Sequence, residues 1–199
     1  MAGRPRTRSD EQIHAATMRV LGRHGPARMT LAHVAAEVGL APSTLAERFG
    51  SKRDLLLAAS RASTSGVGER FEVQRSRHGS PLDALVAALV ELAHPATTRA
   101  AFANHLAALE LDVADPDFRR VAARHAAALR QQIRATLSDA AAAGEIRRAA
   151  DLDGLARALH VAYNGAMVTW AVGGSGPLAD SLRADLEAVL SPWRGEQRQ

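Results

Sequence analysis

Residues 30–53, TLAHVAAEVGLAPSTLAERFGSKR, decide the fold of this chain. Apolar residues recur at helical spacing in their first half, and Thr30 occupies the position of a helix N-cap. Gly39 ends that run, because glycine adopts the positive φ of a helix C-terminal cap without strain. Pro42 then takes the first position of a second helix, where its fixed φ fits. Two short helices joined by a tight turn are typical of a helix-turn-helix.

The segment resembles the DNA-binding part of the tetracycline-repressor (TetR) family. Members carry a helix-start Thr, an Ile-Ala pair, Ala-Gly-Val-Ser in the turn, Gly-Thr-Leu-Tyr in the recognition helix, then His-Phe and Ser-Lys-Glu. This chain matches the framework over residues 9–60, with Val34-Ala35, Val38-Gly39-Leu40-Ala41, Ser43-Thr44-Leu45-Ala46, Arg48-Phe49 and Ser51-Lys52-Arg53 in those places. Ala46 replaces a phosphate-contacting tyrosine, Ala41 a capping serine and Arg48 a histidine.

The resemblance implies that the second helix of this pair contacts DNA. Leu45 and Phe49 are expected to face inward, leaving the polar side free. Arg48 is the main expected contact, with phosphate favoured over guanine. Capping alone remains open for Thr30, and plain solvation for Glu47 and Lys52. The predicted DNA-binding residues are Thr30, Ser43, Thr44, Glu47, Arg48 and Lys52.

Residues 1–60 hold nine Lys/Arg and five Asp/Glu, whereas the remaining 139 residues are balanced, so this part carries the whole net charge of +4. Clustered positive charge gives salt-dependent affinity for phosphate. Residues 1–8, MAGRPRTR, form either a disordered basic arm or one whose Arg4, Arg6 or Arg8 enters a minor groove. Ser9 caps the first helix. The predicted parts are therefore a basic arm (1–8), a helix-turn-helix domain (9–60) and a helical effector-binding and dimerisation domain (61–199).

The composition favours an all-α protein of about nine helices. Aromatic residues make up 4% of the chain, and breakers such as Gly79-Ser80-Pro81 and Asp115-Pro116 separate apolar-periodic runs. Residues 63–68, STSGVG, are expected to be a weak region of a long helix that joins the domains, with a plain linker as the alternative. Further helices are expected over residues 82–92, 102–109, 118–137, 158–172 and 178–190.

The last two helices are expected to form a dimer interface. LHVAYNGAMVTWAV, beginning at Leu159, is apolar nearly all round, which indicates cover on two sides. In TetR-like proteins the terminal helices build a four-helix dimer interface; a buried core helix of a monomer is the alternative. A dimer would present two recognition helices to a palindromic operator in double-stranded DNA. The predicted interface residues are Ala158, Ala162, Gly165, Ala166, Leu182, Leu186 and Val189.

By analogy with the family, a small hydrophobic or amphipathic effector is expected to bind among the C-terminal helices. Each aromatic residue and each methionine can equally be plain core, and Trp170 can instead lie at the interface. The predicted effector-pocket residues are Phe71, Phe102, His105, Leu109, His125, Leu129, Tyr163, Asn164, Met167 and Trp170.

No catalytic, cofactor or metal site is predicted. The eight histidines lack HxxxH spacing, the chain has no cysteine, and GxSxG and P-loop motifs are absent. No secretory signal or membrane span is recognised, so a soluble cytoplasmic protein is expected. The expected function is transcriptional regulation, most simply repression relieved by an effector. The alternatives are a helical small-molecule-binding protein or enzyme without a DNA function, and a regulator that needs no effector.

Overall fold

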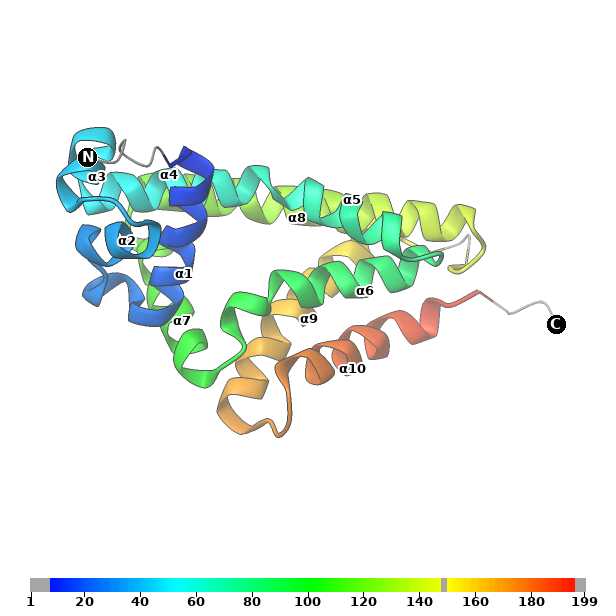
Figure 1. The fold of residues 1–199 in the computed structure, drawn as a ribbon. Helices are drawn as coiled ribbons and strands as arrows, with labels where there is room; N and C mark the ends of the chain where they lie inside the picture. The colour runs from blue at the N-terminus through cyan, green and yellow to red at the C-terminus, as the bar shows by residue number, and fades with distance from the viewer. Residues whose placement is uncertain (1–7, 148–149, 196–199) are drawn as a thin grey trace. The chain divides into compact units, whose positions relative to one another are not determined.

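Residues 8–147 and 150–195 are described in the computed structural model of the chain. Their regular structure is helical, which confirms the predicted all-α class (Figure 1). The α-helices are α1 (Asp10–Arg28), α2 (Leu31–Val38), α3 (Pro42–Phe49), α4 (Lys52–Ser65), α5 (Val67–Arg77), α6 (Pro81–Leu92), α7 (Arg99–Ala114), α8 (Pro116–Ala142), α9 (Leu152–Gly173) and α10 (Leu178–Leu190).

The described residues form ten α-helices where about nine were expected, because Gly66 divides one expected helix into α4 and α5. It stands alone between α4 and α5, and its φ of −79° and ψ of −4° remain close to helical values. The polypeptide therefore passes from α4 to α5 with one interrupted turn, as expected for a weak region of a longer helix. Glycine and a run of short hydroxyl residues have low helix propensity, which explains the interruption here.

The chain packs as two compact units. The N-terminal unit contains the residues up to Ser65 together with Ala100–Arg124, and the C-terminal unit contains Gly66–Arg99 and the residues from His125 onward. Most of α7 and the first turns of α8 therefore belong with the helix-turn-helix. The sequence analysis instead assigned all of residues 61–199 to one domain. A local sequence pattern does not show which distant helices a segment packs against. Of the predicted basic arm, Arg4 and Arg6 lie outside the described residues.

The N-terminal unit has an apolar core built around α1. Ser9 and Gln12 form a reciprocal capping box at its start. Ile13, Ala16 and Val20 are buried at helical spacing. The same cluster also contains apolar residues of α2, α3, α4 and the first turns of α8: Val34, Ala35, Val38, Leu45, Leu55, Leu56, Leu57, Phe118 and Val121.

α1 is broken near its end, at Gly25. The helix continues to Arg28, but Gly25 has a φ of 71° and a ψ of 164°, outside the helical region. Pro26 follows immediately, and the amide of Asn104 on α7 donates to the carbonyl oxygen of Gly22 at 2.8 Å. A Cβ atom on Gly25 would lie 2.7 Å from the side-chain oxygen of Asn104, so glycine is needed at this position.

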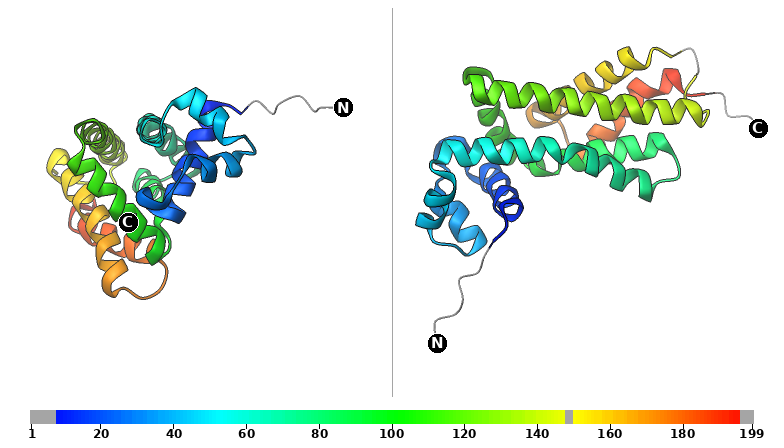
Figure 2. Two further views of the ribbon diagram at one scale, coloured as in Figure 1. Left: turned by 90° about the vertical axis from the view of Figure 1, so that its left-hand side faces the viewer. Right: turned by 90° about the horizontal axis from the view of Figure 1, so that it is seen from above.

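In the C-terminal unit, α9 packs along α10, and α6 contacts both α5 and α10 (Figure 2). Leu155, Leu159 and Met167 line the buried side of α9. Leu182 and Leu186 line that of α10. The carboxylate of Glu145 accepts from the Ser80 hydroxyl and the Leu82 amide, both at 3.0 Å, and so secures the start of α6.

Candidate nucleic-acid interface

The second helix of the helix-turn-helix, α3, is held to its unit by one fully buried side chain. Leu45 has an exposed fraction of 0%, and Phe49 is half-buried against the same core. Ser43, Thr44 and Glu47 are exposed. Since α3 has only eight residues, it depends on this packing and presents its remaining surface to solvent.

The turn before α3 forms as the sequence predicts. Thr30 is exposed, and its hydroxyl accepts from the amide of His33 at 3.2 Å, so the capping role is present. Gly39 adopts the left-handed conformation with a φ of 70°. The amide of Leu40 donates to the carbonyl oxygen of Ala35 at 2.9 Å, which closes the C-terminal end of α2. These contacts set the angle at which α3 leaves α2.

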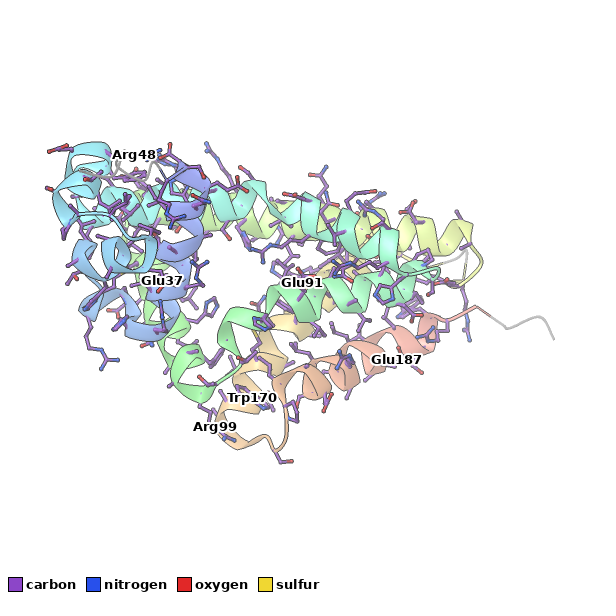
Figure 3. All side chains as sticks on the ribbon, viewed as in Figure 1. Glu37, Arg48, Glu91, Arg99, Trp170 and Glu187 are labelled. Atoms are coloured by element: carbon purple, nitrogen blue, oxygen red, sulfur yellow. The ribbon has the colours of Figure 1, made fainter. Side chains whose placement is uncertain are left out.

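Arg48, the main predicted DNA contact, is engaged within the chain. Its Nη1 donates to the carbonyl oxygen of Arg8 at 2.8 Å. Its Nη2 lies 2.7 Å from a carboxylate oxygen of Asp10, and its guanidinium carbon lies 5.7 Å from the centre of the Phe49 ring. Figure 3 shows Arg48 on the side of α3 that faces the start of α1. Its donors are therefore directed toward the N-terminal end of the domain.

Lys52, another predicted phosphate contact, is directed toward α1. Its Nζ donates to the carbonyl oxygen of Pro26 at 3.0 Å, and the residue is half-buried. The side chain thus ties the first turn of α4 to the turn that follows the kink at Gly25. The sequence pattern did not predict this contact, because 26 residues separate the two partners.

Arg53 joins α4 to the start of α8. Its guanidinium donates to Asp115 at 2.7, 2.8 and 3.0 Å and to Asp117 at 2.8 Å, and it lies 5.6 Å from the Phe118 ring centre. The hydrogen bonds from Arg53 hold the pKa of both aspartates below the usual value of 3.8. This ion pair and the amide of Asn104 fasten α7 and α8 to the helix-turn-helix.

Glu37 is the acceptor of a second ion-pair cluster on the helix-turn-helix. Arg23 and Arg19 of α1 both bind its carboxylate, Arg19 at 3.0 Å. The hydrogen bond from Arg23, followed by that from Arg19, lowers the pKa of Glu37. The cluster fixes α2 against α1, and it uses two of the arginines that give this part of the chain its positive charge (Figure 3).

The predicted effector-pocket residues are divided between the two units. Phe102, His105 and Leu109 belong to α7 in the N-terminal unit, and the other seven belong to the C-terminal unit. His105, Leu109 and Asn164 are exposed, and His125 is half-buried. The remaining six side chains are buried within the chain: Phe71, Phe102, Leu129, Tyr163, Met167 and Trp170.

Two of these buried aromatic side chains have identifiable environments. Burial raises the pKa of the Tyr163 hydroxyl. The indole N–H of Trp170 donates to the carbonyl oxygen of Gly176 at 3.0 Å. The Arg99 guanidinium lies 5.6 Å from the Trp170 ring centre and donates to the carbonyl oxygens of Ala171 and Gly174 (Figure 3). Trp170 therefore helps to stabilise the C-terminal end of α9 and the turn that follows it.

Three of the predicted interface residues point into the chain. Leu182 and Leu186 have exposed fractions of 0%, and Ala166 has 4%, because they fill the contact between α9 and its neighbours. Ala158 and Gly165 are exposed, whereas Ala162 and Val189 are half-buried. The large apolar side chains exposed on α9 are Val161, Val168 and Val172, with exposed fractions of 65%, 45% and 84%.

These three valines were present in the apolar run that the sequence identified. With Gly165 they stand at intervals of four, three and four residues, which places them on one side of α9. Their spacing alone did not reveal this stripe, because the opposite side of α9, with Leu159, Tyr163 and Trp170, is also apolar.

Within the described part of the chain, no group of three or more His, Cys, Asp or Glu side chains is placed to hold a metal ion. No helix there combines the length and apolar character needed to cross a bilayer.

A short exposed helix, set at a fixed angle by a left-handed glycine turn on a basic three-helix domain, defines a helix-turn-helix DNA-binding protein. Two family models divide the chain accordingly: "Bacterial regulatory proteins, tetR family" matches residues 13–59, and "BetI-type transcriptional repressor, C-terminal" matches residues 57–191. The chain belongs to the TetR family of transcriptional regulators.

Solved structures agree with this fold. One is a transcriptional regulator from Saccharomonospora viridis in complex with choline, which is 24% identical in sequence and has a TM-score of 0.74. The match covers 94% of this chain and 98% of that regulator. Another is the transcriptional regulator FadR from Bacillus subtilis in complex with stearoyl-CoA, with 18% sequence identity and a TM-score of 0.68. That match covers 92% of this chain and 98% of FadR. A comparison with curated protein sequences gives no match.

Proposed function

We propose that this chain is a homodimeric transcriptional repressor that leaves its operator when a small amphipathic molecule binds. The observation that carries the DNA-binding part is the geometry of α3, which buries Leu45 and exposes Ser43, Thr44 and Glu47 along one helix. Short polar side chains there reach base edges and phosphates in a major groove. The excess positive charge of residues 1–60 supplies the electrostatic part of the affinity.

Selection of bound duplexes from a random pool tests this directly. The expected result is a palindrome whose half-sites are about 10 base pairs apart or a multiple of that, with affinity that falls steeply as salt rises. Thr44→Ala should weaken binding to the selected sequence more than binding to random duplex. Equal affinity for all duplexes would refute sequence-specific regulation.

The exposed stripe on α9 supports the homodimer. One side of the helix is apolar and consists of Val161, Gly165, Val168 and Val172. Burial of the exposed valines against a partner would add hydrophobic free energy to the association. Gly165 lacks a side chain, and a Cβ there would meet nothing within 4 Å in the chain. A second copy of α9 can therefore approach closely at this position. We infer an interface centred on this stripe, with Ala158 and Ala162 beside it.

Val168→Asp tests the interface, because it places a charge at the centre of the stripe. The expected result is a monomer at micromolar concentration by sedimentation, with operator affinity reduced at least tenfold because one recognition helix binds alone. Ala135→Asp, at an exposed position on α8, is the matched control and should remain dimeric. If the Val168→Asp protein sediments as a dimer, like the wild type, the interface lies elsewhere.

The effector part of the proposal has two lines of support. The C-terminal family model is of the repressor type, and two proteins of this fold were solved with choline and with stearoyl-CoA. Both molecules combine a charged group with alkyl carbon, which suits a mostly apolar site with few polar groups. The buried aromatic residues predicted for the pocket, among them Phe71 and Tyr163, provide such surroundings.

Titrating the protein–operator complex with choline and, separately, with stearoyl-CoA tests this part. Release requires that the molecule bind the operator-free state more tightly, and a tenfold loss of operator affinity corresponds to a coupling free energy of about 1.4 kcal/mol. Operator affinity that neither compound alters at saturation would favour a regulator that needs no effector.

A further inference from the structure

The N-terminal unit contains an open cleft with a volume of about 520 Å³. Its lining residues come from the end of α1, the start of α4, the second half of α7 and the start of α8, all within this unit. The volume lies within the range of about 300–1,000 Å³ that is usual for small-molecule sites. The described lining includes no residue of α2 or α3, so the cleft is separate from the recognition helix.

Most of the wall of this cleft is apolar. Leu56 and Phe118 are buried members of the core of the unit, and Leu111 is half-buried against the same core. Ala107 and Ala114 lie on the same side of α7 as Leu111, and their small side chains leave the space beside it open. An apolar group placed here would lose contact with water on several sides, which favours its binding.

Four charged side chains also line the cleft, and one of them lacks a counter-charge. Arg53 and Asp115 balance each other through their ion pair at 2.7 Å. Glu110 is exposed, so its carboxylate remains hydrated. Lys52 is half-buried, and water therefore solvates its charge less well.

The ammonium group of Lys52 has spare capacity to bind an anion. Its Nζ donates to the carbonyl oxygen of Pro26 at 3.0 Å, and within the described part of the chain it forms no ion pair with a carboxylate. An ammonium group has three donors, and a neutral carbonyl offsets only part of the cost of removing its charge from water. An anionic group at this point would supply the counter-charge and a charge-assisted hydrogen bond.

We propose that this cleft binds a small amphipathic anion. Its anionic group pairs with Nζ of Lys52 beside the Pro26 carbonyl, and its apolar body lies against Leu56, Leu111 and Phe118. A cation of the same shape would be repelled by the ammonium group. The site belongs to the N-terminal unit and is additional to the effector site proposed among the C-terminal helices.

The composition of the chain makes this site directly observable. Lys52 is the only lysine among the 25 Lys and Arg residues, so an amine-acetylating reagent such as N-hydroxysuccinimidyl acetate modifies one side chain. Mass spectrometry of the full-length protein after digestion follows the rate of acetylation at Lys52. The N-terminal amine, which the same reagent modifies, serves as the internal control.

Octanoate is the probe, and octyltrimethylammonium is a cation with the same alkyl chain that does not react with the reagent. Octanoate should slow acetylation of Lys52 in a saturable manner and leave the N-terminal amine unaffected, because a paired and covered ammonium group is a poor nucleophile. The affinity for octyltrimethylammonium, measured by the same protection, should be at least about tenfold weaker, since it forms no charge-assisted hydrogen bond. Equal protection by the two compounds, or none by octanoate, would overturn the proposal.

Ala114→Trp tests whether the protection comes from the cleft. Helix side chains lean toward the N-terminal end of their helix, so the indole would cover Leu111 and fill the space where the alkyl chain lies. The affinity for octanoate should fall at least about tenfold. Ala103→Trp, at an exposed position of α7 outside the lining, is the matched control and should leave the affinity unchanged.

Equal protection of Lys52 in the two tryptophan variants would show that octanoate acts from another site, and would overturn the cleft as its location. Thermal unfolding of both variants at one protein concentration confirms that they remain folded. No DNA enters these measurements. Their outcome is therefore independent of whether the chain binds a specific operator, which the duplex selection tests.

Discussion

Leu45→Ala should loosen the recognition helix without altering any residue that faces DNA. Leu45 is fully buried, and it is the residue by which the eight-residue α3 enters the core. The substitution removes three buried carbon atoms, worth about 0.8 kcal/mol each, or about 2.4 kcal/mol. The cavity left behind adds about 1–2 kcal/mol. The expected loss of unfolding free energy is therefore about 3.4–4.4 kcal/mol, a large part of the usual total of about 5–15 kcal/mol.

Urea unfolding followed by helical circular dichroism, at one fixed protein concentration, measures this loss. An isolated helix of this length is unstable in water, so operator affinity should also fall, by about tenfold or more. Thr44→Ala is the matched control on the same helix: it should change stability by less than about 0.5 kcal/mol. A Leu45→Ala protein whose unfolding free energy stays within about 0.5 kcal/mol of wild type would show that α3 does not depend on this packing.

Two further predictions concern the supports of the helix-turn-helix. Gly25→Ala should lower the free energy of unfolding more than Gly39→Ala, although both glycines have a φ near 70°. The alanine Cβ at position 39 would meet nothing within 4 Å, and the substitution should cost about 1 kcal/mol. At position 25 the Cβ would lie 2.7 Å from Asn104, in a backbone conformation that is nearly restricted to glycine. Equal melting temperatures for the two variants would contradict this ranking. Arg53→Gln should lower the melting temperature at pH 7 by more than Arg124→Gln, an exposed arginine of α8. Because Arg53 depresses the pKa of Asp115 and Asp117 below 3.8, its stabilisation is complete above that pH and is lost as pH falls through the folded-state values. The difference between wild type and Arg53→Gln should therefore shrink as the pH falls below 3.8, and a difference that does not shrink in acid would argue against the ion pair as its source.

The site was predictable where its geometry depends on neighbours in sequence. The cap at Thr30, the left-handed turn at Gly39 and the proline at the start of α3 each depend on a few adjacent residues, and each forms as expected. The inward position of Leu45 follows from helical spacing alone. The interactions of Arg48 and Lys52 could not be foreseen, since a charged side chain on a surface helix has the same local pattern whether it meets a phosphate, a carboxylate or a backbone carbonyl.

The apolar stripe on α9 illustrates the same limit. Residues from Leu159 onward are apolar around most of the helix, so periodicity identified a helix covered on two sides but did not separate the two sides. Packing against α10 buries Leu159 and Met167 and leaves Val161, Val168 and Val172 exposed.

The amino-acid sequence by itself determined the helical class, the presence of most helices and the identity of the recognition helix, because backbone preference and apolar periodicity act over a few residues. The helices predicted over residues 102–109, 118–137 and 158–172 are longer in the structure, as α7, α8 and α9. The tertiary structure decided which helices share a unit, which side of α9 is exposed, and that Arg8 is anchored between α2 and α3. Those outcomes depend on interactions between residues far apart in the chain. Which of several such interactions forms depends on the packing of the whole unit, and local propensity carries no information about it.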